Sequence, residues 1–485
     1  MTEDSIKKQT LLGVKWTALE QFSTQAITFV LSIILARLLL PSDYGIIGML
    51  AVFMAVSGTF IDSGFGQALI RKSDIKEEDY STVFYFNLFV SVLCYAAAFL
   101  CSSLIASFFN MPILSLIVKV YCLTLVINAF GSVQRTRLTK NLDFKALAKI
   151  NVISTIFSGV VGIALAYAGW GVWALVWQAV LSGIFSNIIL WIIAKWMPQR
   201  VFSKESFKDL FGFGSKVLVG GIIWQIYANL TPIIIGKFFS AKDLGFYSRG
   251  SNIAQLPANT IFSVLSKVTY PIFAKLQNDE ERLVYVYRKY IKSTSMAIMF
   301  SLLLLTALAK PIVLILLTDK WVDCIIYLQL FAISIITDHV DKLNLNLLNV
   351  VGRSDLTLKL EVYKRVISLT ILLASIPFGI IGICVSKIIY AQIALMFNTY
   401  YAGKLFGIGY WLQMKDFCPY IVIGVICVAP AYLLTYTSMP NWIVVGVGTV
   451  IAVALYMGIL KLSKDASYEE FVVPIVDKYL YLLKK

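Results

Sequence analysis

The sequence predicts an all-α protein that crosses a membrane about fourteen times. Three observations lead to this fold class. Hydrophobic residues make up 59% of the 485 residues and charged residues only 14%, and the mean hydropathy is +0.80. Apolar stretches of roughly 20 residues, the length that a bilayer core requires, follow one another along almost the whole chain. The segments between them are too short to fold alone, which excludes most soluble enzymes.

The expected spans follow from the apolar stretches. We expect them to begin near Leu12, Tyr44, Thr82, Ile113, Ala148, Val172, Phe213, Ser251, Ser293, Ile325, Tyr363, Ile383, Phe417 and Asn441. Two of these helices meet near Gly379 and Gly382 with almost no loop between them. A single continuous helix there would be about twice as long as a bilayer accepts, so we expect two.

Lysine and arginine gather in alternate loops. The basic loops lie at residues 71–76, 135–149, 195–208, 275–292, 353–365 and 404–415. The loops near Asn110, Gly169, Pro377 and Ser438 carry neither residue. By the positive-inside rule, this alternation places both termini in the cytoplasm. The net charge of +15 is therefore mostly topological, and we expect no nucleic-acid partner, because the basic residues are not gathered on one foldable domain.

A short internal repeat accompanies this topology. Residues 36–45 read ARLLLPSDYG, and residues 236–245 read GKFFSAKDLG. Each segment follows an expected outward span and ends at the start of the next one. Asp43 and Asp243 occupy the same place in the two segments, where an aspartate caps the free N–H groups of a helix.

The repeat predicts a division of the chain into related parts. We expect two pseudo-symmetric six-helix bundles, at residues 1–200 and 201–410, and a C-terminal helix pair with a cytoplasmic tail at residues 411–485. The seven cysteines lie mostly within apolar spans and show no C-x-x-C spacing. We therefore expect no disulfide, no metal and no cofactor, and no catalytic residues.

Cations at membrane depth are candidates for substrate contact, because a charge there is costly and usually faces a cavity or a partner. They are Lys119, Lys267 and Lys387, with Arg37 nearer the interface. The three lysines have no carboxylate within a helical turn. They therefore either line a cationic cavity, which would attract an anion, or form ion pairs with other helices.

A second set of polar residues is a candidate for the cavity wall or for ion or proton coupling. It comprises Glu20, Asp62, Asp338, His339 and Lys342. The alternative is that these residues have structural roles only. Asp338 and Lys342 are four residues apart and can neutralise each other on one helix, and Glu20 can pair with a neighbouring lysine. His339, the one histidine, is either a proton relay or a hydrogen-bonded structural residue.

Three segments resemble the polysaccharide transporter family. They are GVKW at residues 13–16, ARLLLPSDYG at residues 36–45 and DSGFGQALIRK at residues 62–72. This family is the lipopolysaccharide, O-antigen and exopolysaccharide flippase branch of the multidrug/oligosaccharidyl-lipid/polysaccharide exporter superfamily, and the sequence looks most like its colanic-acid-exporter-like members. The resemblance covers the whole chain in topology, whereas its specific motifs lie in the first three spans.

The resemblance implies a flippase of the bacterial inner membrane. Such a protein moves an undecaprenyl-diphosphate-linked oligosaccharide from the inner to the outer leaflet while its two bundles alternate between inward- and outward-facing states. It also implies that membrane lipids are partners, that a polysaccharide polymerase and export machinery act on the product, and that a monomer suffices. The final helix pair resembles the pair associated with a lipid groove in lipid II flippases.

Other functions remain open at the level of the sequence. A cation- or proton-coupled drug exporter of the same superfamily is the main alternative, although its cavity should be rich in acids rather than lysines. A membrane glycosyltransferase or polymerase would need catalytic groups on a large outward loop, and the outward loops here are short. A structural or assembly protein is a further alternative.

Overall fold

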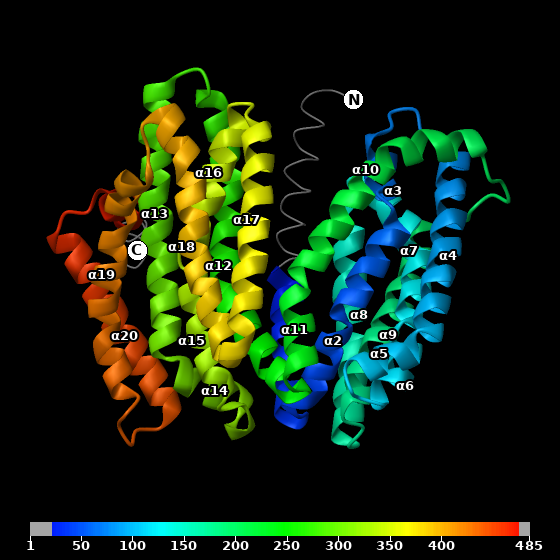
Figure 1. Ribbon diagram of the computed structural model, residues 1–485, viewed down its shortest axis with the longest axis horizontal. Coiled ribbons are helices and arrows are strands. Elements are labelled where there is room, and N and C mark those ends of the chain that lie inside the picture. Colours follow the sequence, from blue (N-terminus) through cyan, green and yellow to red (C-terminus); the bar gives the residue numbers. More distant parts are fainter. Residues whose placement is uncertain (1–21, 475–485) are drawn as a thin grey trace, which may run out of the picture. The chain divides into compact units, whose positions relative to one another are not determined.

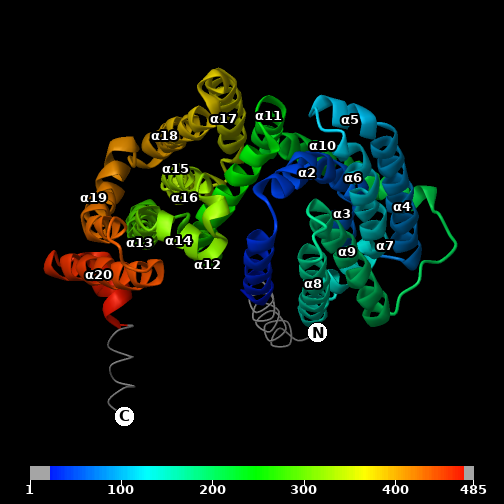
Figure 2. The ribbon, with the colours of Figure 1, turned by 90° about the horizontal axis from the view of Figure 1, so that it is seen from below.

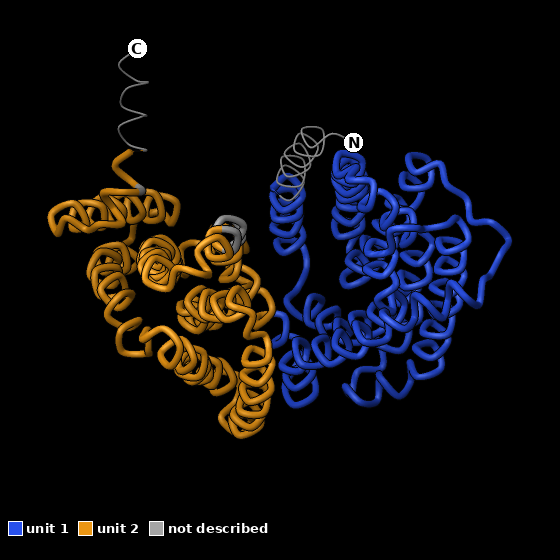
Figure 3. The backbone as a smooth tube through the Cα atoms, turned by 90° about the horizontal axis from the view of Figure 1, so that it is seen from above, with its two compact units in different colours: residues 1–245 blue, residues 246–485 orange. Residues whose placement is uncertain are grey.

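The computed structural model describes residues 22–474, without the side chains of residues 263–268, 270, 271 and 471. Every regular element in this part of the chain is helical, which confirms the all-α class. The chain forms two compact units, Met1–Gly245 and Phe246–Lys485 (Figure 3). The predicted division near residues 200 and 410 stays a prediction.

The described helices of the first unit vary from segments of seven residues to full spans. They are Phe22–Leu38, α2 (Pro41–Asp62), α3 (Phe65–Arg71), α4 (Glu77–Leu100), α5 (Ser102–Phe108), α6 (Ile113–Tyr121), α7 (Leu123–Lys140), α8 (Phe144–Tyr167), α9 (Val172–Ala194), α10 (Lys204–Ala228) and α11 (Leu230–Phe238). Helix α9 packs against α7 and α8, and α7 packs against α4 (Figures 1 and 2). Long apolar helices thus lie side by side. This suits a bilayer, because each helix forms the hydrogen bonds of its backbone N–H and C=O groups within itself.

Aromatic side chains join α3 and α4 to the segment around α10. Phe65 of α3 is fully buried, and its ring centroid lies 5.0 Å from that of Phe86. The Phe84 ring lies edge-on to Trp196, with the centroids 6.1 Å apart. Edge-to-face pairs of this kind add about 0.5–1.5 kcal/mol to the burial of the rings.

Charged groups close the end of this aromatic cluster. Arg137 donates a hydrogen bond of 2.7 Å to Glu77, and Lys72 forms ion pairs of 3.1 Å with both Asp79 and Asp209. Burial lowers the pKa of the Lys72 ammonium group, but the two carboxylates outweigh burial, so the pKa lies above its ordinary value. These pairs fix the turn between α3 and α4.

The two repeated segments have the same local structure. In each, a helix ends, two residues break it, and a new helix begins, at Pro41 for α2 and at Ala241 for α12. The Asp43 carboxylate accepts a hydrogen bond of 2.9 Å from the backbone N–H of Leu40. Asp243 accepts one of 3.3 Å from the N–H of Ser240. The predicted capping roles of Asp43 and Asp243 are therefore confirmed.

The second unit contains the remaining described helices. They are α12 (Ala241–Leu276), which crosses the boundary between the units, α13 (Glu280–Ala307), α14 (Ala309–Leu317), η1 (Asp319–Trp321), α15 (Cys324–Ser334), α16 (Asp338–Val350), α17 (Ser354–Ser375), η2 (Ile376–Phe378), α18 (Gly379–Phe406), α19 (Tyr410–Leu434), α20 (Asn441–Leu462) and η3 (Tyr468–Val472). Helix α18 packs against α15, α16, α17 and α19 (Figure 2). Among the polar residues of α16, His339 and Asn344 are buried.

The predicted break near Gly379 is present. Helix α17 ends at Ser375, η2 follows, and α18 begins at Gly379 with φ of +73°. Glycine adopts this left-handed backbone conformation without the penalty that a side chain would bring. The chain therefore reverses within a few residues, and the interpretation as two helices is confirmed.

Eleven helical stretches within residues 22–474 are long and apolar enough to cross a membrane. One of them, Ser354–Phe406, comprises both α17 and α18. The chain is thus a multi-pass membrane protein. The count of fourteen spans and the cytoplasmic position of the termini stay predictions.

Candidate functional site

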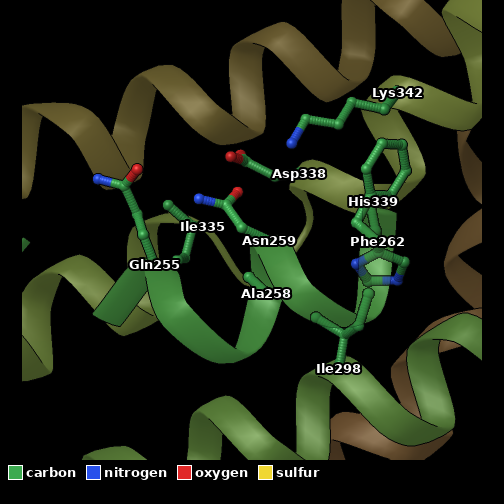
Figure 4. Close-up of a pocket in the computed structure, with 9 residues that line it drawn as sticks. All are labelled: Gln255, Ala258, Asn259, Phe262, Ile298, Ile335, Asp338, His339 and Lys342. Atoms are coloured by element: carbon green, nitrogen blue, oxygen red, sulfur yellow. The ribbon is translucent and has the colours of Figure 1, made fainter. Parts of the chain in front are cut away.

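A polar cavity of about 240 Å³ lies inside the second unit. Side chains from α12, from α13, from the junction of α15 and α16, and from α16 itself line it (Figure 4). The lining residues are Gln255, Ala258, Asn259, Phe262, Ile298, Ile335, Asp338, His339 and Lys342. Three of them, Asp338, His339 and Lys342, are residues that the sequence singled out.

A break between two helices creates this cavity. Helix α15 ends at Ser334 and α16 begins at Asp338, with a turn between them. The Ser334 hydroxyl donates a hydrogen bond of 2.8 Å to the carbonyl of Phe331, an interaction that competes with regular helix. The stretch Cys324–Val350 as a whole is long and apolar enough to cross a membrane, in agreement with the span expected from Ile325. Asp338 and Asp341 in the first turn of α16 suit the positive end of its dipole.

Asp338 and Lys342 are the charged residues that line the cavity, and Lys387 of α18 lies near Asp338 without lining it. Asp338 interacts electrostatically with both Lys342 and Lys387. Among the described residues, Asp338 forms no direct ion pair with either lysine. Any neutralisation of Asp338 by Lys342 therefore acts across a distance and not through an ion pair in contact. Figure 4 shows the Asp338 carboxylate, the Lys342 side chain and the Asn259 amide directed into the same space. With both lysines charged, this group carries one net positive charge.

Aromatic rings hold the two ammonium groups. The Nζ atom of Lys342 lies 4.6 Å from the ring centroid of Phe262. The Nζ atom of Lys387 lies 4.7 Å from the centroid of Phe331 and 5.3 Å from that of Tyr247. A ring face attracts a cation by about 2 kcal/mol where water is excluded. The lysines are thus held without a carboxylate in direct contact, which leaves their charge available to an anion.

His339 points to a neighbouring helix. It is 2% exposed, and its Nε2 atom lies 2.8 Å from the hydroxyl oxygen of Ser295 on α13. The structural alternative, a hydrogen-bonded histidine, therefore has a partner in the structure. The role of His339 as a proton relay stays a prediction.

The other predicted site residues do not line this cavity. In the first unit, Nζ of Lys119 lies 4.9 Å from the ring centroid of Phe99, and Arg37 is exposed on the helix Phe22–Leu38. Glu20 lies outside the described residues, and Lys267 lies on α12 at a position whose side chain is outside them.

Asp62 has a structural partner of its own. Its carboxylate accepts hydrogen bonds from the backbone N–H groups of Gly64 and Gly66, at the start of α3. This arrangement satisfies donors that the first turn of a helix leaves free. The coupling role of Asp62 stays a prediction.

Sequence reasoning missed the neutral polar residues of the site. Gln255 and Asn259 lie four residues apart on α12, which is the spacing of one helix face. That spacing is a signal present in the sequence, although uncharged amides are common in helices and do not by themselves indicate a cavity. Only the packing of α12 against α16 identifies them.

The fold defines a polytopic membrane protein. The chain belongs to the polysaccharide biosynthesis protein family, whose model matches residues 34–326. The resemblance predicted from the sequence is thereby confirmed.

Relatives of known name agree with this family. The chain is 28% identical to the teichuronic acid biosynthesis protein TuaB of Bacillus subtilis, over 73% of each chain. It is 24% identical to the lipopolysaccharide biosynthesis protein WzxC of Escherichia coli, over 74% of each chain. It is also 25% identical to the succinoglycan biosynthesis transport protein ExoT of Rhizobium meliloti, over 69% of this chain and 68% of that one.

Solved structures share the fold. The lipid II flippase MurJ in an inward closed conformation matches with a TM-score of 0.76 at 12% identity, over 94% of this chain and 99% of that one. An inward-facing multidrug transporter of the MOP superfamily matches with a TM-score of 0.59 at 15% identity, over 85% of this chain and 96% of that one. At these identities the likeness concerns the fold alone.

Proposed function

We propose that this protein is a flippase that moves an undecaprenyl-diphosphate-linked oligosaccharide from the inner to the outer leaflet of the bacterial inner membrane by alternating access. The family and the named relatives belong to polysaccharide biosynthesis, and one relative is named as a transport protein. The shared fold of a lipid II flippase agrees with this proposal. The lipid-linked glycan is then the partner of the site, and the polyprenyl tail stays in the lipid.

The observation that carries the proposal is the charge at the cavity, where Asp338 and Lys342 are half-buried. Lys342 and Lys387 face one carboxylate, Asp338, and rest on aromatic rings. A cation held in a medium of low dielectric attracts an anion far more strongly than it would in water. A diphosphate group supplies that anion, and the amides of Gln255 and Asn259 supply hydrogen bonds for phosphate or sugar oxygens.

The test is a flipping assay with purified protein in liposomes. The probe is a fluorescent undecaprenyl-diphosphate oligosaccharide, and the measurement is the accessibility of its head group on the opposite leaflet. Lys342→Ala and Lys387→Ala should each slow flipping by about 10- to 100-fold, because each removes a charge-assisted contact of about 1.5–3 kcal/mol. Lys404→Ala is the matched control, since Lys404 is an exposed residue on the same helix as Lys387.

The outcomes separate the proposal from its main alternative. Flipping that is unchanged in both cavity variants contradicts an anion site at Lys342 and Lys387. Absence of flipping with several glycans, together with efflux of a cationic dye, would favour the drug-exporter function. The cavity charge argues against that function, because two lysines and one aspartate repel an organic cation.

A further inference from the structure

A second polar group lies on α16 at a position turned about 100° around the helix from Lys342. Residues 341 and 342 point about 100° apart on a helix, so Asp341 does not share the direction of Lys342. Asp341 faces Asn398 of α18, and α16 packs against α13, α17 and α18. Asp341 is not among the residues that line the cavity described above.

Three atoms of this pair lack hydrogen bonds. Asn398 is fully buried. Within the described part of the chain, the Oδ1 atom of Asp341 and both the Oδ1 and Nδ2 atoms of Asn398 are shielded from solvent without a hydrogen-bond partner. Unpaired buried polar atoms are rare, because each costs about 1–3 kcal/mol in fold stability. The side chains of Asp341 and Asn398 thus interact with each other, but their hydrogen bonding is incomplete.

The charged groups around Asp341 are engaged elsewhere. Lys364 of α17 interacts with Asp341 electrostatically, but its Nζ atom lies 2.5 Å from the carboxylate of Glu361. From α16 itself, Asp338 adds a like charge. From α13, the hydroxyl of Tyr287 donates a hydrogen bond of 3.5 Å to Gln413. Among the described residues, Asp341 has no ion pair in contact.

The neutral polar groups nearby are also engaged. Gln413 of α19 and Asn344 of α16 exchange two hydrogen bonds of 2.9 Å. The Nε2 atom of Gln413 also donates to the carbonyl of Ile408 at 2.9 Å. The side-chain amide of Asn398 is therefore the polar group that the neighbouring helices offer to Asp341 for hydrogen bonding.

A proton completes the pair. A protonated carboxyl group and a primary amide form two hydrogen bonds, one from the carboxyl O–H to Oδ1 of Asn398 and one from Nδ2 of Asn398 to the carboxyl group. An ionised Asp341 can only accept, which leaves Oδ1 of Asn398 without a donor. Burial also disfavours the charged form.

We propose that Asp341 is a proton-binding site in which the protonated carboxyl group pairs with the Asn398 amide between α16 and α18. Proton uptake from water forms the O–H bond and changes the charge of the side chain from −1 to zero. Proton release restores a buried carboxylate next to an amide oxygen that repels it. The pair thus gives α16 and α18 two states that differ in stability. The use of this proton to drive transport rests on the proposed flippase function.

Infrared difference spectroscopy tests the proton site directly. Purified full-length protein in liposomes should show a protonated carboxyl C=O band at neutral pH that shifts in D₂O and is lost in Asp341→Asn. Asn398→Ala should keep the band but shift its frequency, because one hydrogen-bond partner is removed. Asp355→Asn, at an exposed carboxylate on α17 that pairs with Arg353, is the matched control and should keep the band unchanged. Asp338→Asn removes a like charge near Asp341 and should keep the band. Thermal unfolding of each variant checks that the fold is retained.

A spectrum that is the same in wild type and in Asp341→Asn from mildly acidic to alkaline pH overturns the proposal. Loss of the band in Asp338→Asn with its retention in Asp341→Asn overturns it as well. These results do not depend on flipping, so failure of the proposed function would be seen separately in the transport assay. In that assay, Asp341→Asn should abolish the response of the flipping rate to an imposed pH gradient. A full response in this variant contradicts coupling through Asp341.

Discussion

A carboxylate near the end of a membrane-spanning helix can be stabilised by backbone amides as well as by a cation, and Asp62 is an example. Its oxygens accept from Gly64 and Gly66, which begin the short helix α3. Lys342 and Lys387 illustrate a related point, because aromatic rings rather than carboxylates hold their ammonium groups. At the scale of single residues, the partner decides the role of a buried charge.

The cap at Asp62 leads to a stability prediction. Asp62→Ala removes the acceptor for two backbone N–H groups and should lower the free energy of unfolding by about 1–2 kcal/mol. Asp62→Asn keeps a side-chain oxygen and should lose less. Thermal unfolding of the purified protein measures both. Equal stability of Asp62→Ala and wild type would mean that the cap contributes nothing, and would favour a functional role for this residue.

At the scale of elements, the two repeated segments meet by their backbones inside the first unit. A side-chain carbon added at Gly45 would lie 1.7 Å from the carbonyl oxygen of Ala241, and one added at Gly245 would lie 1.9 Å from that of Pro41. Each segment thus places a glycine against the helix start of the other. The repeat that the sequence contains is therefore also a packing contact, and its glycines permit the close approach.

Gly45→Ala and Gly245→Ala should each be destabilising by about 1–3 kcal/mol, because the added carbon must push two backbones apart. Gly58→Ala in the same helix α2 is the control, since nothing lies within 4 Å of the added carbon there. That change should be neutral or slightly stabilising. Thermal unfolding or the yield of folded protein in the membrane is the measurement. Tolerance of alanine at both Gly45 and Gly245 would contradict the close contact.

At the scale of the whole molecule, the distribution of lysine and arginine sets the orientation in the membrane. Basic loops alternate with loops that hold few or no basic residues. Because basic residues are retained on the cytoplasmic side, the chain should cross the membrane about fourteen times and keep both ends inside.

Single cysteines in a variant without the native seven test this topology. In this background, the cysteine of the Gly169→Cys or the Ser438→Cys variant should react with an impermeant maleimide added to intact cells. Cysteines at Lys76 and Lys145 should react only after the membrane is permeabilised. Labelling of Ser438 from the cytoplasmic side alone would show that the number of spans before it is wrong by one.

The outcome of each sequence inference depends on the range of the interaction behind it. Helix periodicity and hydropathy are local, so the all-α membrane fold and the two helices at Gly379 were predictable. The caps at Asp43 and Asp243 were predictable for the same reason, since each spans three residues. The grouping of Asp338, His339 and Lys342 followed from their spacing on one helix.

Tertiary packing decided the rest of the site. The approach of Gln255 and Asn259 of α12 to α16 joins segments that are distant in the chain. The rings that hold Lys387 and the amide that faces Asp341 likewise come from other helices. The sequence by itself determined that the protein is helical, lies in a membrane and carries charges at depth, because hydropathy and helical spacing are properties of neighbouring residues. Only the tertiary structure decided which of those charges meet, because contacts between helices depend on how apolar surfaces pack, and many pairings of similar helices satisfy the same hydropathy.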